Sequence, residues 1–325
     1  MPEIPVTIAT VPYDRTEALR SGEIVPEGLR LDYRPHFPAH EIFLAMAERN
    51  AYDASEMSLS LYLNRRARND FPFVAIPVFP SRYFRHGAIF VHTKSGIRTP
   101  KDLEGRRIGI QEYRQTAAVW VRGMLRDDFG VDTASFRWVE GGINTPRGPH
   151  VSDVRPDRTL SIEHLPSGRT QSAALAAGEI DALISARTPD SLAASGEVVR
   201  LFPDYRTVEQ AYFRRTGIFP IMHTFVIRED LYRAHPWMAQ SLFDAFQAAK
   251  AEAMRRMRYT GAMMAMTPWL QADVEEMDRV FGGDAWPYGL EPNRAHLATF
   301  LRYLVEDGFL TETPPLDELF APVGA

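Results

Sequence analysis

The 325-residue sequence contains no cysteine. Disulfide bonds, thiolate nucleophiles, iron–sulfur clusters and cysteine zinc sites are therefore excluded. The sequence also lacks a long apolar run without charges, and Met1 leads directly into a strand-like stretch at 4–11 instead of a basic and then apolar leader. We therefore expect a soluble, cytoplasmic protein with no membrane segment.

The sequence has no concentration of positive charge. Its formal net charge is -5, with both signs interspersed, so a nucleic acid is not an expected partner. There is no His-x-His or His-Glu-x-x-His pattern, and His36 and His40 are separated by Pro38. A nucleophile elbow, a phosphate-binding glycine loop and a dinucleotide fingerprint are absent too. We expect neither a metal nor a cofactor.

Strand-like and helix-like segments alternate along the chain, which predicts an α/β protein with largely parallel sheets. Its length favours two lobes, with residues 1–92 and 200–325 in the first and residues 93–199 in the second. We expect strands at 6–10, 29–34, 54–57, 73–78, 88–92, 107–111, 180–185, 198–202 and 221–227. Helices are expected at 41–49, 60–68, from 116 onward, and at 170–177, 236–257 and 293–306.

Two segments have no assigned chemistry. The stretch 141–169 is rich in proline, glycine and arginine and long for a connection, so it could be a lid, an oligomer contact or a surface loop. Methionines cluster at 254, 257, 263, 264 and 266, which is typical of core or oligomer packing. A homo-oligomer is therefore an expectation.

The segment 73–86 ends an apolar run in charged residues. We expect its two prolines, at 77 and 80, to limit ladder bonding and to push residues 81–86 out of the sheet. Arg82, Arg85 and His86 would then meet at the sheet's rim. Two guanidinium groups beside an imidazole suit an anionic ligand that also needs a proton. A structural ion-pair cluster would give the same pattern.

Polar residues follow other predicted strands: Tyr13, Asp14, Arg15 and Thr16 after the first, Ser58 after the third, and Gln115 and Thr116 after the strand at 107–111. Ligands of α/β proteins bind at such strand ends. Helix capping alone would explain Asp14, Thr16 and Ser58, but it does not explain Tyr13 and Arg15. The helix start at Gln115 and Thr116 would favour a carboxylate.

Histidine supplies the candidate proton donors. His86 follows the two arginines, and His223 lies within the predicted strand 221–227. A histidine in an apolar strand is commonly a satisfied core residue, so both interpretations stay open for each.

Several segments together resemble one known family. They are residues 13–16, 55–60, 71–82, 84–86, 116–123, 178–183, 217–223 and 286–290. They resemble the 4,5-dihydroxyphthalate decarboxylase family, a branch of the type II periplasmic-binding-protein superfamily, and the resemblance runs nearly end to end. It implies two α/β lobes joined by two crossovers, with a ligand cleft between the lobes that closes by hinge motion.

The resemblance also implies decarboxylation of a small hydroxylated aromatic carboxylate without an organic cofactor, with 4,5-dihydroxyphthalate giving protocatechuate as the expected reaction. We hypothesise that Arg82 and Arg85 hold a carboxylate and that His86 or His223 donates the proton. Arg15 and the helix start at Gln115 and Thr116 would fix the far end of the ring, and Asp14 would orient or ionise a phenol. Tyr13, Thr16 and Ser58 are further expected substrate-binding residues. The alternative is a solute-binding protein for an aromatic carboxylate, cytoplasmic or exported, without catalysis.

Overall fold

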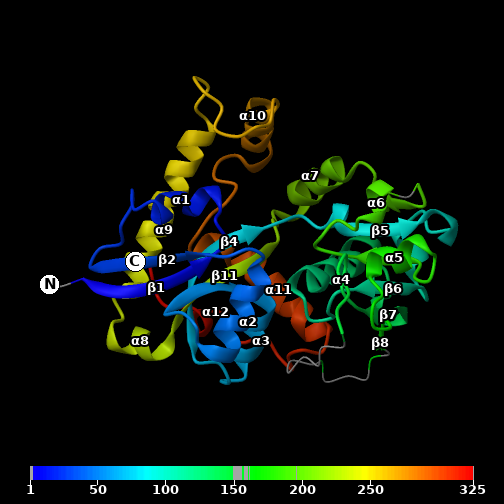
Figure 1. The fold of residues 1–325 in the computed structure, drawn as a ribbon, viewed down its shortest axis with the longest axis horizontal. Coiled ribbons are helices and arrows are strands. Elements are labelled where there is room, and N and C mark those ends of the chain that lie inside the picture. Colours follow the sequence, from blue (N-terminus) through cyan, green and yellow to red (C-terminus); the bar gives the residue numbers. More distant parts are fainter. Residues whose placement is uncertain (1–2, 149–155, 157–159, 161, 195, 325) are drawn as a thin grey trace. The chain divides into compact units, whose positions relative to one another are not determined.

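The computed structural model describes residues 3–148, 156, 160, 162–194 and 196–324, and the chain divides into two compact units (Figure 1). The first unit comprises Met1–Arg82, Ile221–Leu297 and Pro314–Ala325, and the second comprises Tyr83–Pro220 and Ala298–Thr313. The chain thus changes unit after residue 82, not after 92, and returns at 221, not at 200. The reason is that the strand expected at 88–92 pairs with strands of the second unit.

The first unit contains a five-stranded sheet of order β2-β1-β3-β11-β4. Its strands are β1 (Ile4–Thr10), β2 (Leu29–Pro35), β3 (Ala54–Ser58), β4 (Phe73–Arg82) and β11 (Ile221–Arg228). Strand β11 is antiparallel to both neighbours, whereas β1 is parallel to β2 and β3. The helices of this unit are α1 (Glu17–Arg20), α2 (Ala39–Arg49), α3 (Leu59–Ala67), α8 (Glu229–Ala234), α9 (Met238–Met257), α10 (Leu270–Phe281) and α12 (Leu316–Leu319).

The second unit contains a six-stranded sheet of order β10-β5-β9-β6-β7-β8. Its strands are β5 (Ile89–His92), β6 (Arg107–Ile110), β7 (Arg137–Glu140), β8 (Ile162–His164), β9 (Ala182–Ile184) and β10 (Val198–Arg200). Strand β5 is antiparallel to β9 and β10, and the pairs among β9, β6, β7 and β8 are parallel. The helices are α4 (Thr116–Phe129), α5 (Gln171–Ala176), α6 (Ser191–Ala194), α7 (Tyr205–Thr216) and most of α11 (Arg294–Glu306).

The predicted α/β class is confirmed, but the expectation of largely parallel sheets is not, because β11 and β5 each run antiparallel to both of their neighbours and make both sheets mixed. Helices α7 and α10 were not expected, and the stretch 141–169 contains the edge strand β8. Residues 149–155, 157–159 and 161 of that stretch lie outside the described residues, so its expected role as a lid or contact stays a prediction.

The prediction for the end of β4 is wrong. Despite Pro77 and Pro80, the strand continues to Arg82, and β11 pairs with it up to the partners Ile221 and Arg82. The prolines are tolerated because β4 is an edge strand of its sheet, where a missing N–H breaks no second ladder. Ser81 and Arg82 therefore remain in the sheet, and only Tyr83 and the residues after it leave it.

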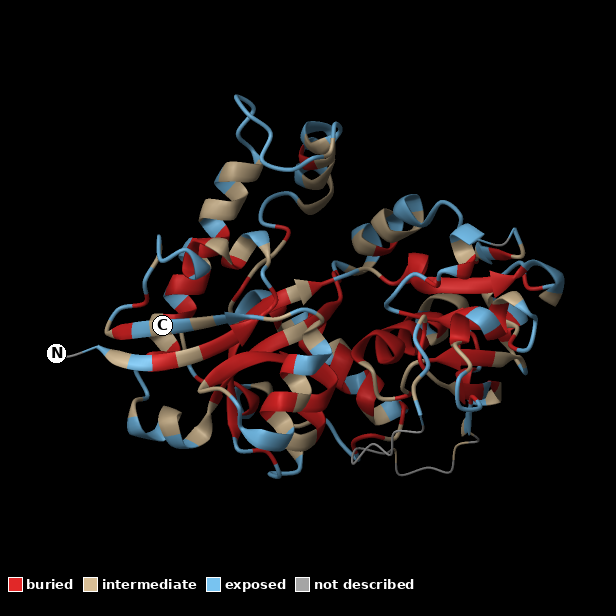
Figure 2. Cartoon of the chain, viewed as in Figure 1, coloured by how far each residue is buried: buried red, intermediate tan, exposed pale blue. Residues whose placement is uncertain are grey.

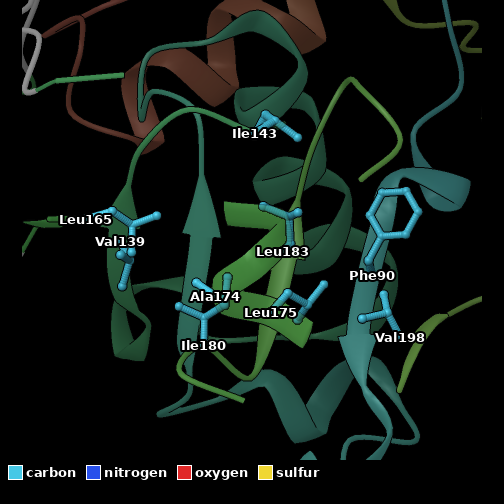
Figure 3. Close-up of a cluster of buried hydrophobic side chains, with 9 residues drawn as sticks. All are labelled: Phe90, Val139, Ile143, Leu165, Ala174, Leu175, Ile180, Leu183 and Val198. Atoms are coloured by element: carbon cyan, nitrogen blue, oxygen red, sulfur yellow. The ribbon is translucent and has the colours of Figure 1, made fainter. Parts of the chain in front are cut away.

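Each sheet carries its own apolar core. Figure 2 shows most strands of both sheets largely buried, with exposed residues in loops, on outer helix faces and on the edge strands β2 and β8. In the second unit, strands and α5 enclose a dry cluster (Figure 3), formed by Phe90, Val139, Ile143, Leu165, Ala174, Leu175, Ile180, Leu183 and Val198. Burial of such side chains contributes about 1.5–3 kcal/mol each.

Local sequence sets the ends of the helices near the predicted site residues. The Ser58 hydroxyl accepts a hydrogen bond from the Leu61 N–H and so caps α3. Helix α4 starts at Thr116 as predicted and ends at Phe129. The next residue, Gly130, caps it with a φ of 60°, the left-handed conformation that glycine adopts without strain.

The methionine cluster is not a core element throughout. Met254 and Met257 are half-buried on α9, but Met263, Met264 and Met266 are exposed in the loop that joins α9 to α10. Core packing therefore does not explain these three residues, and self-association stays a prediction. In the described part of the chain, no helix combines the length and the apolar character needed to cross a membrane.

Candidate functional site

The site in the first unit is organised around the carboxylate of Glu56, which lies in β3 and is fully buried. Four groups donate hydrogen bonds to it. Oε2 accepts from the Thr10 hydroxyl at 2.8 Å and the Val11 N–H at 3.0 Å. Oε1 lies 2.8 Å from the Tyr13 hydroxyl and 2.6 Å from Nδ1 of His223. Such a set of donors compensates the cost of burying a charge.

The hydrogen bonds to Glu56 keep its carboxylate ionised. Burial pushes the pKa of Glu56 upward, but the bonds from His223, Val11 and Thr10 outweigh it and hold the pKa below its usual value. Burial and the neighbouring Glu56 carboxylate raise the pKa of the Tyr13 hydroxyl, which therefore stays protonated. Because Glu56 is an anion, Nδ1 of His223 carries the proton that it donates.

His223 lies at an irregular point of β11. The register with β4 shifts on both sides of this residue, a bulge of the kind that re-aims a side chain. Phe43 packs edge-on against its ring, with 4.8 Å between ring centroids. The side chain remains 19% exposed, and Nε2 takes part in no hydrogen bond within the described residues. One nitrogen is thus fixed on Glu56 while the other can meet a ligand.

Arg15 contacts Tyr13, which in turn hydrogen-bonds the Glu56 carboxylate. Its guanidinium carbon is 3.9 Å from the centre of the Tyr13 ring and 4.6 Å from that of the Trp286 ring. Nε donates to the Pro80 carbonyl at 2.6 Å, and Nη1 to Asp14 at 3.0 Å. Nη2 takes part in neither bond. Arg15, Tyr13, Glu56 and His223 therefore form one continuous line of contacts, with a cation at one end and an imidazole at the other.

Aromatic and aliphatic side chains flank this line. Tyr13, Phe43 and Tyr52 pack against the buried cluster of Ala9, Val11 and Ile42. A planar aromatic ring with a carboxylate could rest on such a surface, with the carboxylate toward the guanidinium.

The other first-unit candidates near β1 and β3 have structural partners. Asp14 is exposed and pairs with Arg15. The buried Thr16 hydroxyl donates to the Tyr13 carbonyl and accepts from the Tyr13 N–H. Ser58 is the cap of α3 and lies opposite His223 in the β3–β11 pairing.

Arg82 is buried inside the first unit, where burial lowers its pKa to about 9 and leaves it charged at neutral pH. Its Nη2 donates to the Pro287 carbonyl at 2.9 Å and to Oδ1 of Asn293. The structure thus gives Arg82 partners in its own unit, whereas the sequence suggested a ligand carboxylate.

Arg85 and His86 belong to the second unit. Burial lowers the pKa of Arg85 to about 10, and its guanidinium lies 4.7 Å from the Tyr83 ring centre. His86 is 1% exposed and packs edge-on against Phe202 and Tyr212. Burial, and then the charge of a nearby arginine, lowers the pKa of His86 to about 4. The predicted Arg82–Arg85–His86 group is therefore divided between the units.

Gln115 and Thr116 are where the sequence places them, at the start of α4 in the second unit. Gln115 occupies the N-cap position without a side-chain cap bond, and Thr116 is buried. Their predicted contact with a ligand stays a prediction. Within the described residues, no group of three or more His, Asp or Glu side chains is placed to hold a metal ion.

Sequence reasoning missed two residues of the site. Glu56 lies inside the segment 55–60, and an acidic residue within an otherwise buried strand was the available signal. Trp286 is part of the segment 286–290, which was noted only for its resemblance. Its contact with Arg15 joins residues far apart in the chain and had no local signal.

Comparison with solved structures identifies the fold. Two similar chains are the periplasmic aliphatic sulphonate binding protein SsuA from Escherichia coli and a Candida albicans protein, CA3427, described as having the generic periplasmic binding protein fold. The match to SsuA has a TM-score of 0.55 at 13% identity and covers 99% of this chain and 98% of SsuA. The match to the Candida protein has a TM-score of 0.50 at 13% identity and covers 100% of this chain and 96% of that protein. The protein has the periplasmic-binding-protein fold.

Comparison with curated proteins identifies the family. The chain is 35% identical over 323 residues to a 4,5-dihydroxyphthalate decarboxylase from Comamonas testosteroni, covering 99% of this chain and 98% of that one. A Pseudomonas putida protein of the same name is 36% identical over 189 residues, 58% of this chain and 73% of its own. No protein-family model matches the chain. The chain belongs to the 4,5-dihydroxyphthalate decarboxylase family, a family of carboxy-lyases, which confirms the resemblance.

Proposed function

We propose that this protein decarboxylates 4,5-dihydroxyphthalate to protocatechuate, with His223 as the general acid and Arg15 as a carboxylate-binding residue. The observation that carries the proposal is the Glu56–His223 pair in contact with Tyr13, which in turn lies against Arg15. The activity named for the full-length relative requires these two tasks, a proton for the ring and a grip on the second carboxylate.

The ring can supply the electrons for this reaction. The hydroxyl para to the departing carboxylate pushes density onto the ipso carbon, which takes a proton from Nε2 of His223. The bond between that carbon and the carboxylate then breaks, carbon dioxide leaves, and the electron pair restores aromaticity. His223, now neutral, regains a proton from solvent.

The Glu56 carboxylate serves this step by position and charge. It holds Nδ1 of His223 at 2.6 Å, which leaves Nε2 as the ring nitrogen that can donate to a ligand. The Tyr13 hydroxyl, kept protonated, fixes the same carboxylate oxygen from the other side. The pair is thus oriented before a ligand arrives, which is where a positioned acid gains its advantage.

The first experiment is to incubate the purified full chain with 4,5-dihydroxyphthalate and to follow protocatechuate by chromatography and carbon dioxide by trapping. Phthalate, which has no para hydroxyl, is the matched control and should yield no benzoate. Binding of 4,5-dihydroxyphthalate without product would favour the solute-binding alternative.

The role of Arg15 has its own test. Arg15→Ala should raise KM for the dicarboxylate about tenfold or more with a smaller change in kcat, because charge-assisted bonds to a carboxylate contribute about 1.5–3 kcal/mol. Arg68→Ala removes an arginine outside the described line of contacts and is the control. An unchanged KM in Arg15→Ala would show that another residue holds the carboxylate.

The finer expectations also belong to this proposal. A cytoplasmic location and a place in the breakdown of aromatic compounds agree with the substrate class. Fractionation of the source cells, and growth of a deletion strain on a phthalate-type carbon source, would test them.

A further inference from the structure

The segment 284–290, between α10 and α11, runs along the outer edge of β4. Gly289 N–H donates to the Pro77 carbonyl at 2.8 Å. Nε1 of Trp286 donates to the Phe79 carbonyl at 3.0 Å. An edge strand with prolines has carbonyls without a neighbouring strand, and this segment supplies donors to them. The Trp286 side chain is thereby attached to the end of β4 that also binds Arg15.

The buried side-chain amide of Asn293 hydrogen-bonds two carbonyls of this segment. Asn293 is 0% exposed, and its Nδ2 donates to the Pro287 carbonyl at 2.9 Å and to the Gly289 carbonyl at 2.7 Å. Its Oδ1 accepts from Arg82, which also donates to the Pro287 carbonyl at 2.9 Å. Asn293 and Arg82 together therefore hold Pro287 and Gly289, which follow Trp286 in the chain, while Lys250 donates to the Trp286 carbonyl at 2.9 Å.

Trp286 links this segment to Arg15, because its ring contacts the Arg15 guanidinium. The guanidinium carbon lies 3.9 Å from the centre of the Tyr13 ring and 4.6 Å from that of the Trp286 ring, and its Nε donates to the Pro80 carbonyl. A free arginine side chain has several rotamers, and ordering it on binding costs affinity. An arginine already in contact with two rings loses less freedom when a carboxylate binds.

We propose that Asn293, acting with Arg82, is a positioning residue that holds Trp286 against Arg15 and so prepares Arg15 for the substrate carboxylate. This inference rests on the proposed function of Arg15. It gives Arg82 an indirect role, because its Nη2 is directed to Pro287 and Asn293 of its own unit.

The test is Asn293→Asp, which keeps an acceptor for Arg82 but removes the amide donor to the two carbonyls. KM for 4,5-dihydroxyphthalate should rise about 3- to 10-fold with kcat nearly unchanged, the effect of one side chain losing its pre-ordering. Trp286→Leu should raise KM to a similar extent. In the double variant the rises should not multiply, because both changes remove the same contact.

The matched control is Tyr62→Phe, which removes buried hydrogen bonds to the Ala75 N–H and the Leu319 carbonyl in the same unit. It should lower stability and leave KM unchanged. If Asn293→Asp behaves like this control, or if its effect multiplies with that of Trp286→Leu, the proposal is overturned.

A measurement without substrate separates this inference from the proposed function. The Trp286 indole N–H signal, assigned by its loss in Trp286→Leu, should shift in the NMR spectrum of Asn293→Asp and stay in place in Tyr62→Phe. An unmoved signal overturns the positioning role whatever the activity. A shifted signal, with KM unaffected by Arg15→Ala, would instead reject the carboxylate-binding role of Arg15 and with it the effect expected on KM.

Discussion

Nδ1 of His223 lies 2.6 Å from Oε1 of Glu56, although the two residues are 167 positions apart in the chain. The antiparallel pairing of β3 with β11 sets His223 opposite Ser58, so Glu56, two residues before Ser58, is its diagonal neighbour on the same face of the sheet. The bulge at His223 adjusts the aim of its ring. Two consequences of this pair, and two of other buried residues, can be measured.

His223→Gln should lower kcat about 10²- to 10⁴-fold with little change in KM, because a positioned general acid contributes that much to the rate. His36→Gln is the control, since His36 hydrogen-bonds Tyr52 and does not contact Glu56. Steady-state kinetics on 4,5-dihydroxyphthalate decide the matter. If both variants keep normal turnover, the proton comes from another group.

Glu56→Gln should lower kcat with a smaller change in KM, because the amide that replaces the carboxylate holds Nδ1 of His223 less firmly and the proton donor loses its fixed orientation. The readout is kcat and KM for 4,5-dihydroxyphthalate. An unchanged kcat in a folded Glu56→Gln protein would show that Glu56 does not serve the proton transfer.

The sequence predicted most elements of the fold, because periodic apolar residues and alternating elements depend on local patterns. The sequence-based prediction was wrong where the end of a strand, or the sheet to which it belongs, depends on pairing between distant parts of the chain. The strand at 73–82 continues through Pro77 and Pro80 because it lies at the edge of its sheet and has a neighbouring strand on one side only. The sequence around these prolines does not reveal that edge position. Similarly, the strand 89–92 joins the second sheet through partners about a hundred residues further along the chain.

In the candidate site too, residues with a local sequence signal were predicted and those that depend on distant pairing were missed. Tyr13, Arg15 and His223 were predicted from their places at strand ends or in strands, and the structure brings these three into one line of contacts. Glu56, which links them, depends on the register between β3 and β11, and the sequence does not specify that register. Arg82 and His86 were expected to meet at the sheet's rim because they are four residues apart, yet the chain changes unit between them.

His86 should affect stability in a pH-dependent way. Its folded pKa of about 4 lies below the ordinary 6.5, so between these values the unfolded chain binds a proton that the folded chain does not. The unfolding free energy of the wild type, minus that of His86→Gln, should therefore decrease as the pH falls from 6.5 to 4. The decrease should reach up to about 1.4 kcal/mol per pH unit.

Taking the difference between the two proteins matters because Glu209 lies beside His86, with a pKa raised to about 7 by burial, and titrates in the opposite sense. Denaturant unfolding at several pH values provides the free energies, and kcat measured on the same samples tests the predicted catalytic role. A large loss of kcat in a folded His86→Gln protein would return His86 to the role of proton donor.

Gly123 on α4 should tolerate no side chain. A Cβ at this position would overlap the ring of Tyr303, which is held in place by its hydroxyl bond to Asp127 at 2.7 Å and by edge-on packing against Trp120. Gly123→Ala should therefore lower the unfolding free energy by about 1–3 kcal/mol, the usual cost of overpacking, in spite of the better helix propensity of alanine.

The control for this change is Gly196→Ala, since a Cβ there meets no atom within 4 Å. Denaturant unfolding of the two variants should show a loss for the first and almost none for the second. The cause can be isolated in a Tyr303→Leu background, where the smaller side chain makes room and the cost of Gly123→Ala should largely disappear. If the cost is the same with and without the ring, the loss arises in the α4 backbone and not in the contact with Tyr303.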